Sequence, residues 1–167
     1  MLILGIDPGP NASGVVVYDS VARRVIHSDK TATETDIGLL LIPTHKFRLA
    51  HIIIERPAAM GPMGAGKVGH MLDTAWAAGR LEAIAERANS TGTTVHTLTR
   101  REVVRHLGVM SGKGSADARV RAACIADHGG TQRAAVGVKR EPGPLYGVTS
   151  HSWQALGLVL AWLEINK

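Results

Sequence analysis

Two acidic side chains stand at the ends of short apolar runs. Asp7 follows the run LILGI, and Glu55 follows the run HIII. A carboxylate at the end of a buried strand is unfavourable unless a metal ion, a cation or hydrogen bonds compensate its charge. On neighbouring strands, the two carboxylates would lie side by side and offer the oxygen ligands that Mg²⁺ and Mn²⁺ prefer. The alternative is structural: Asp7 belongs to an Asp-Pro-Gly turn, and Glu55 pairs with Arg56.

Two glycine patterns between residues 61 and 69 have the spacing of phosphate-binding loops. GPMGAGK matches a P-loop, but Val68 stands where that motif needs Ser or Thr to hold a magnesium ion. GAGKVG matches a dinucleotide-binding loop, but the acids about twenty residues later, Glu82 and Glu86, fall inside a predicted helix and not at a strand end. We therefore interpret this segment as a flexible loop with a positive tip.

The positive charge of the chain is concentrated in one quarter of the sequence. The net charge is +5 over 167 residues, yet residues 1–99 carry equal numbers of acidic and basic side chains. Residues 100–140 contain nine Lys or Arg and three Asp or Glu, so this segment supplies the whole excess. A concentrated positive patch is typical of proteins that bind nucleic acid. The alternative is a solvated surface with an incidental excess of charge.

The composition excludes several classes of protein. With 45% hydrophobic and 20% charged residues, the chain resembles a globular domain and not a disordered segment. No apolar run approaches the roughly 20 residues that span a bilayer, and the first ten residues lack the basic stretch of a signal peptide. The single cysteine, Cys124, excludes an internal disulfide framework and a Cys-cluster zinc site. We therefore expect a cytoplasmic protein with no membrane partner.

A sheet is needed to bring the two acids together, and the apolar pattern predicts one. We expect strands at residues 2–7, 13–19, 23–30, 51–55 and 94–98. We expect helices at residues 33–50, where Pro43 introduces a break, and at residues 70–89, 99–107, 115–128 and from about 150 onward. This order predicts one α/β domain over residues 1–167, with a mixed five-stranded sheet flanked by helices.

Helix caps and one loop complete the predicted organisation. Thr99 and Glu102 form a capping-box pattern, and Ser115 is a second N-cap. Thr149 or Ser150 is expected to cap the final helix. Residues 133–147 are rich in Pro and Gly and predict a mobile basic loop.

Five segments, in order along the chain, resemble the RuvC-type Holliday junction resolvases of the RNase H-like superfamily. LGIDPGPNASGVVVYD resembles their opening hairpin, HIIIERP their second catalytic strand, and AAGRLEAIAE the long helix that follows. LGVMSGKGSADARVR resembles their loop with Gly, Ser and Lys. HSWQALGLVLAW resembles their last helix, which usually begins with Asp or His and carries Asp three residues later. The resemblance implies an RNase H-like fold.

The resemblance also implies a metal site and a reaction. It places Asp7, Glu55, His151 and Gln154 around Mg²⁺ or Mn²⁺ ions for two-metal hydrolysis of a phosphodiester. Lys113 is the candidate cation for the phosphate. Gln154 departs from the family, because a neutral amide stands where Asp is usual, and this should weaken metal binding. Three explanations stay open: an active enzyme that uses His151 in part, a chain with a substituted catalytic Asp, or a natural binder that has lost cleavage.

The implied partner is branched DNA, above all the Holliday junction. We expect these basic side chains to contact its backbone: Lys67, His70, Arg100, Arg101, Arg105, Lys113, Arg119 and Arg121. A homodimer is implied because a junction presents two equivalent strands, and the small residues between 75 and 81 are its candidate interface. The alternative, favoured for most of these residues, is core packing against the sheet. Such a protein acts in DNA recombination and repair, in a bacterium or in the host of a phage. The alternatives are a non-cleaving junction binder and a nuclease acting on structured RNA or replication forks.

Overall fold

A mixed five-stranded sheet forms the centre of the computed structural model, which describes residues 1–41, 47–58, 65–88 and 92–167, without the side chains of residues 65–67 and 88. Its strands are β1 (Leu2–Asp7), β2 (Ser13–Asp19), β3 (Arg24–Ala32), β4 (Leu49–Arg56) and β5 (Thr94–Thr99). They are ordered β3-β2-β1-β4-β5. The pairs β3-β2 and β2-β1 are antiparallel, whereas β1-β4 and β4-β5 are parallel. The predicted mixed sheet is therefore confirmed.

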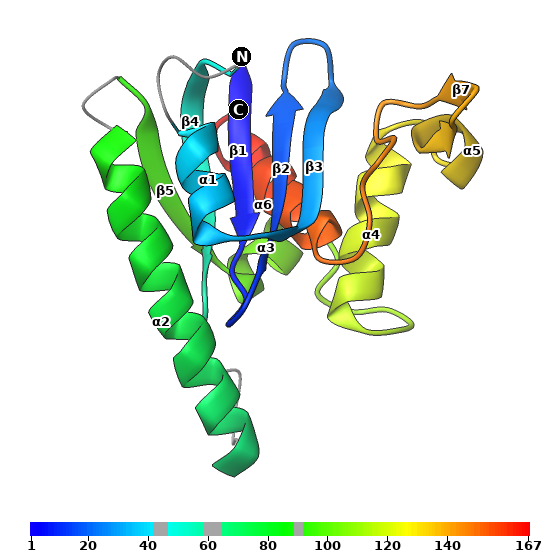
Figure 1. Ribbon diagram of the computed structural model, residues 1–167. Helices are drawn as coiled ribbons and strands as arrows, with labels where there is room; N and C mark the ends of the chain where they lie inside the picture. The colour runs from blue at the N-terminus through cyan, green and yellow to red at the C-terminus, as the bar shows by residue number, and fades with distance from the viewer. Residues whose placement is uncertain (42–46, 59–64, 89–91) are drawn as a thin grey trace.

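Helices cover both faces of this sheet (Figure 1). The helices α3 (Arg100–His106), α4 (Ala116–Asp127) and α6 (Ser152–Ile165) lie on one face, and α1 (Glu34–Leu40) and α2 (Ala65–Ala88) lie on the other. A hydrophobic core lies on each face, and alternate residues of β1 pack into one or the other: Ile3 packs with α6, whereas Leu4 packs with α1 and α2. This follows from the two-residue period of a strand, which sends successive side chains to opposite faces.

Helix α6 is buried almost all round because it lies between the sheet and the helices α3 and α4. Every residue from Ser152 to Trp162 is buried. Two glycines allow this close approach: a Cβ on Gly5 would lie 2.2 Å from the carbonyl oxygen of Ala155, and a Cβ on Gly157 would lie 2.4 Å from a methyl of Val120. The first contact brings the start of α6 to the carboxyl end of β1.

Two of the three predicted helix caps are confirmed. Thr99 and Glu102 form the capping box of α3, and the Ser115 hydroxyl accepts from the first turn of α4. The prediction of Thr149 or Ser150 as the cap of the last helix is wrong. Its N-cap is His151, without a side-chain cap, because the preceding turn is closed by the Ser152 hydroxyl, which donates to the Thr149 carbonyl at 2.5 Å.

Two predicted element boundaries are wrong. The helix expected over residues 33–50 is α1, which ends at Leu40, and strand β4 begins at Leu49. Strand pairing with β1 overrides the helical pattern at that point, because Leu49 completes the register opposite Leu2. The long helix α2 begins at Ala65, earlier than the predicted residue 70.

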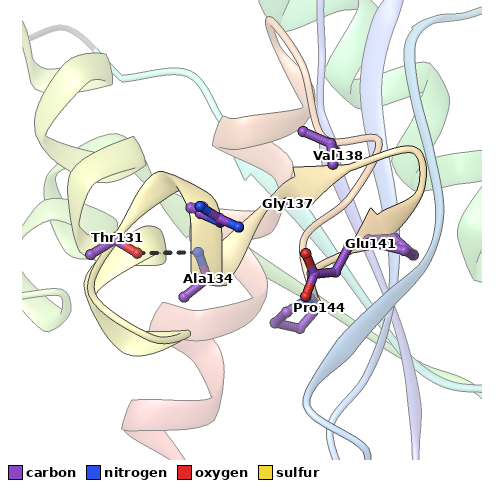
Figure 2. Close-up of a pocket in the computed structure, with 9 residues that line it drawn as sticks. Thr131, Ala134, Gly137, Val138, Glu141 and Pro144 are labelled. Atoms are coloured by element: carbon purple, nitrogen blue, oxygen red, sulfur yellow. Dashed lines mark hydrogen bonds between the residues drawn. The ribbon is translucent and has the colours of Figure 1, made fainter.

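Residues 131–148 form an ordered lobe, contrary to the predicted mobile loop. It contains α5 (Gln132–Ala135) and the short strands β6 (Gly137–Val138) and β7 (Glu141–Pro142). Leu145 is fully buried, and the carbonyl of Pro144 accepts a 2.8 Å hydrogen bond from the backbone of Val25 on β3. Figure 2 shows the open pocket between Thr131 and the β6-β7 turn. The lobe lies at the end of the sheet opposite the carboxyl end of β1 (Figure 1).

Candidate active site at the carboxyl ends of β1 and β4

Asp7 and Glu55 end two adjacent parallel strands. Ile6 of β1 lies opposite Ile54 of β4, so the residues that follow them emerge together at the same edge of the sheet. The side chains of both acids are only 15% exposed. The predicted juxtaposition of two carboxylates is therefore confirmed. Their role as metal ligands remains a prediction.

Burial raises the pKa values of both carboxyl groups, and the charge of Asp7 adds to the rise for Glu55. Burial, followed by the charge of Asp7, raises the pKa of Glu55 to about 7, and Arg100 opposes this rise. Burial also raises the pKa of Asp7, against the lowering effects of His151 and Arg100. The pair therefore gains more from a bound cation than two solvated acids would.

Two buried oxygens at this end of the fold have no hydrogen-bond partner in the described part of the chain. They are Oε2 of Glu55 and Oε1 of Gln154. Unsatisfied buried oxygens are unfavourable, and carboxylate and amide oxygens are ligands for Mg²⁺ and Mn²⁺. The donor types thus fit a divalent cation. Among the described residues, however, no three His, Cys, Asp or Glu side chains are grouped closely enough to hold one.

His151 contacts Asp7 across the fold. Its Nδ1 lies 3.2 Å from Oδ2 of Asp7, although the two residues are 144 positions apart, and its side chain is 69% exposed. Gly14 on β2 makes this contact possible, because a Cβ there would lie 2.5 Å from the His151 backbone. An exposed imidazole beside a buried carboxylate can exchange protons with solvent and with a bound substrate.

Gln154 lies one turn after His151 on α6 and is buried. It lines a shallow pocket of ≈ 320 Å³ between the first turns of α4 and α6, together with Asp117 and Arg121. The structure therefore places the neutral side chain near the site that the resemblance predicts. No hydrogen bond joins Gln154 to Asp7 among the described residues.

Arg100 also belongs to this site, although the sequence placed it among the DNA contacts. One guanidinium nitrogen, Nη1, lies 3.5 Å from Oε2 of Glu55, and the other, Nη2, forms an ion pair with Asp117 on α4. Glu55 therefore pairs with Arg100, and the alternative pairing with Arg56 is not seen. The sequence contained one signal of this role: Arg100 directly follows β5, the strand that pairs in parallel with β4.

Several other predicted basic residues are engaged within the protein. Arg119 is half-buried and donates to the carbonyls of Val109 at 2.9 Å and Gly114 at 2.7 Å, which closes the loop 108–114. Arg121 donates to Gln132 and lies over the Trp153 ring at 5.3 Å. These contacts give both arginines structural roles, and their contact with DNA remains a prediction.

The remaining predicted DNA contacts are exposed. Lys113 stands on the outside of the loop 108–114, and Arg101 and Arg105 project from α3. His70 is exposed on the first turns of α2, whereas the side chain of Lys67 lies outside the described part of the structure.

Solved structures share this fold. The chain aligns with T. thermophilus RuvC in complex with a Holliday junction substrate at a TM-score of 0.62 and 20% identity, covering 99% of this chain and 94% of that one. It aligns with the yeast mitochondrial Holliday junction resolvase Ydc2 at a TM-score of 0.56 and 11% identity, covering 97% and 77%. No family model and no curated protein sequence matches. The predicted RuvC-type, RNase H-like fold is therefore confirmed, and the low identities carry the likeness no further than the fold.

Proposed function

We propose that this protein is a structure-selective endonuclease that cleaves Holliday junctions or other branched DNA by metal-dependent hydrolysis. The observation that carries the proposal is the buried pair Asp7 and Glu55 at the ends of adjacent parallel strands, with His151 against Asp7. The similarity in fold to two proteins described with Holliday junctions supports this choice of substrate.

Asp7, Glu55 and Gln154 are the residues that would hold Mg²⁺ or Mn²⁺. A divalent ion supplies Lewis-acid stabilisation of the phosphate and activation of a water molecule. His151 would orient Asp7 through their 3.2 Å contact and would take up a proton near the scissile phosphate. Lys113, exposed on its loop, supplies a positive charge for the developing charge on the phosphate oxygens.

Exposed basic side chains support a DNA partner. Arg101, Arg105 and Lys113 form no ion pair within the described residues, so their charge is available for phosphates. Arg100, Arg119 and Arg121 have partners within the protein, and their contact with DNA remains a prediction. Such a protein would serve recombination and repair of DNA in the cytoplasm of a bacterium or a phage host.

An exposed apolar ridge on α2 supports a homodimer. Leu72 and Trp76 are 59% and 71% exposed and, with Val68, recur every four residues along one side of the helix. In the candidate interface at residues 75–81, Ala77, Ala78 and Leu81 are buried within the protomer, whereas the other four residues are exposed. The amino-terminal half of α2 extends beyond the sheet at the end where β1 terminates (Figure 1). A second copy on this ridge would bury it and pair two sites.

A second candidate function is binding of branched DNA without cleavage. Gln154 favours it, because its buried oxygen lacks both a charge and a hydrogen-bond partner. Two carboxylates hold a divalent ion less tightly than three or four.

A cleavage assay separates the two candidates. A labelled four-way junction and a linear duplex are incubated with Mg²⁺ or Mn²⁺ and with the wild type, Asp7→Asn, Gln154→Asp or the control Asp73→Asn on the exposed side of α2. Junction cleavage that is lost in Asp7→Asn and kept in Asp73→Asn supports the endonuclease. Binding without cleavage, with cleavage gained in Gln154→Asp, supports the binder. Equal affinity for linear and branched DNA would refute both.

A further inference from the structure

The Arg100 side chain joins the carboxylate pair to a separate helix. Arg100 is the first residue of α3 and directly follows β5, and only 15% of its side chain is exposed. One end of its guanidinium faces Glu55 at 3.5 Å, and the other forms a hydrogen bond and ion pair with Asp117 in the first turn of α4. Asp117 itself is largely exposed. One cation is thus shared between a buried acid of the site and a solvated acid outside it.

The two halves of this bridge differ in strength. The Arg100–Asp117 contact is a direct hydrogen bond, whereas Oε2 of Glu55 has no hydrogen-bond partner despite the nearby guanidinium. Arg100 therefore compensates the negative charge of Glu55 without forming a hydrogen bond to its Oε2 atom. The guanidinium can move away from Glu55 and keep its bond to Asp117, since it forms a hydrogen bond with Asp117 and none with Oε2 of Glu55.

The position of Arg100 matters because a divalent cation would meet the same carboxylate. Asp7 and Glu55 together carry two negative charges when ionised, and Gln154 adds none. A guanidinium within 4 Å lowers the net charge that attracts a second cation, and the weak solvent screening at a mostly buried site preserves this effect. Arg100 and a metal ion at Glu55 are therefore alternatives for the same negative charge.

We propose that Arg100 is a built-in cation that competes with a divalent metal ion for Glu55, and that Asp117 retains the guanidinium when the metal ion binds. The proposal rests on the metal-dependent function proposed above. It links metal binding at Glu55 to the first turn of α4, which follows directly on the loop that carries Lys113. Arg100 would then offset part of the cost of the buried carboxylates in the metal-free protein, and the site would take up metal with an affinity set by Arg100 and Asp117.

Binding of Mn²⁺ to the purified protein tests this competition without any cleavage assay. Electron paramagnetic resonance of free Mn²⁺ gives the dissociation constant for the wild type, Arg100→Met and the matched control Arg101→Met, which removes an exposed charge one residue away. We expect Arg100→Met to bind Mn²⁺ about tenfold more tightly, because a charge at this distance shifts cation binding to a carboxylate by one or more powers of ten. Arg101→Met should stay within about twofold of the wild type.

Asp117→Asn provides the opposite change, with Asp73→Asn as its control. Loss of the outer partner leaves Arg100 to Glu55 alone, so Mn²⁺ binding should weaken about threefold or more. Unchanged or weaker binding by Arg100→Met, or tighter binding by Asp117→Asn, would overturn the proposal. Thermal unfolding provides a second readout: Arg100→Met should melt earlier than wild type in EDTA and gain more from Mn²⁺. If Arg100→Met fails to fold, Arg100→Gln, which removes the charge but keeps a polar side chain, should also bind Mn²⁺ more tightly.

The outcomes also separate this inference from the proposed function. If the wild type binds Mn²⁺ and Arg100→Met is no tighter, the competition is refuted and the metal-dependent function stands. If no variant binds Mn²⁺, both the competition and the metal-dependent step are refuted, whereas junction binding is judged by its own assay.

Discussion

The buried Glu55 carboxyl makes the metal-free protein sensitive to pH, and Glu55→Gln should remove that sensitivity. Burial and the nearby Asp7 raise the pKa of Glu55 from the ordinary 4.5 to about 7. Below pH 4.5 the group is protonated in the folded and unfolded chains alike, so it imposes no penalty. Between pH 4.5 and about 7 the unfolded chain releases the proton and the folded chain retains it. Stability therefore falls as the pH rises through this window, and the full penalty is present above it.

The size of this effect follows from the shift itself. A rise of about 2.5 pKa units at about 1.4 kcal/mol per unit corresponds to about 3 kcal/mol. The free energy of unfolding of Glu55→Gln, relative to the wild type, should therefore rise by about 3 kcal/mol from pH 4.5 to pH 8. The side chain is mostly buried, so solvent screening reduces this figure only modestly.

Urea unfolding in EDTA at pH 4.5, 6 and 8 measures this difference. Glu86→Gln, an exposed acid on α2, is the control, and its difference from the wild type should be nearly constant with pH. Addition of Mg²⁺ or Mn²⁺ at pH 8 should stabilise the wild type and leave Glu55→Gln nearly unchanged, because the cation compensates the carboxylate that the variant lacks. A difference between Glu55→Gln and wild type that is flat from pH 4.5 to 8 would refute the argument from burial.

Three further changes probe the elements that position the site. Gly5→Ala should destabilise the protein by about 2 kcal/mol or more in urea unfolding, because its Cβ would lie 2.2 Å from a carbonyl oxygen of α6. The control is Gly79→Ala, where a Cβ meets nothing, and it should stabilise α2 by about 0.5–1 kcal/mol. Arg119→Met should open the loop 108–114, seen as faster proteolysis there with little loss of global stability; unchanged cleavage would show that the loop holds itself. Trp76→Ser should shift sedimentation equilibrium toward monomer, and an unaltered mass would exclude the α2 ridge as the dimer interface.

Local chemistry explains what could be predicted from the sequence. The apolar runs that end in Asp7 and Glu55 indicated two buried strands, and the structure places these strands side by side in parallel. The pattern of Thr99 with Glu102 predicted the start of α3, because a capping box involves only four consecutive residues. These features depend on near neighbours in the chain, and the sequence displays near neighbours directly.

Helix ends and the lobe depended on contacts that the sequence does not display. Leu49 belongs to a segment with a helical pattern but lies in strand β4, because it pairs with Leu2 of β1. The lobe at residues 131–148 is ordered because Leu145 is buried and Val25 of β3 supplies a hydrogen bond. Composition rich in Pro and Gly predicts the lack of long helices or strands there, but it does not predict mobility once such anchors exist.

The sequence alone predicts the order of the strands along the chain, the acids at their ends and the segment that carries the positive charge. Which of these charges meet depends on the folded arrangement. Arg100 lies between Glu55 and Asp117, Arg119 closes its own loop, and His151 reaches Asp7 from 144 positions away. Backbone propensity and periodicity act between residues a few positions apart in the sequence. Ion pairs and burial depend instead on distances in space, which exist only after α6 packs on the sheet.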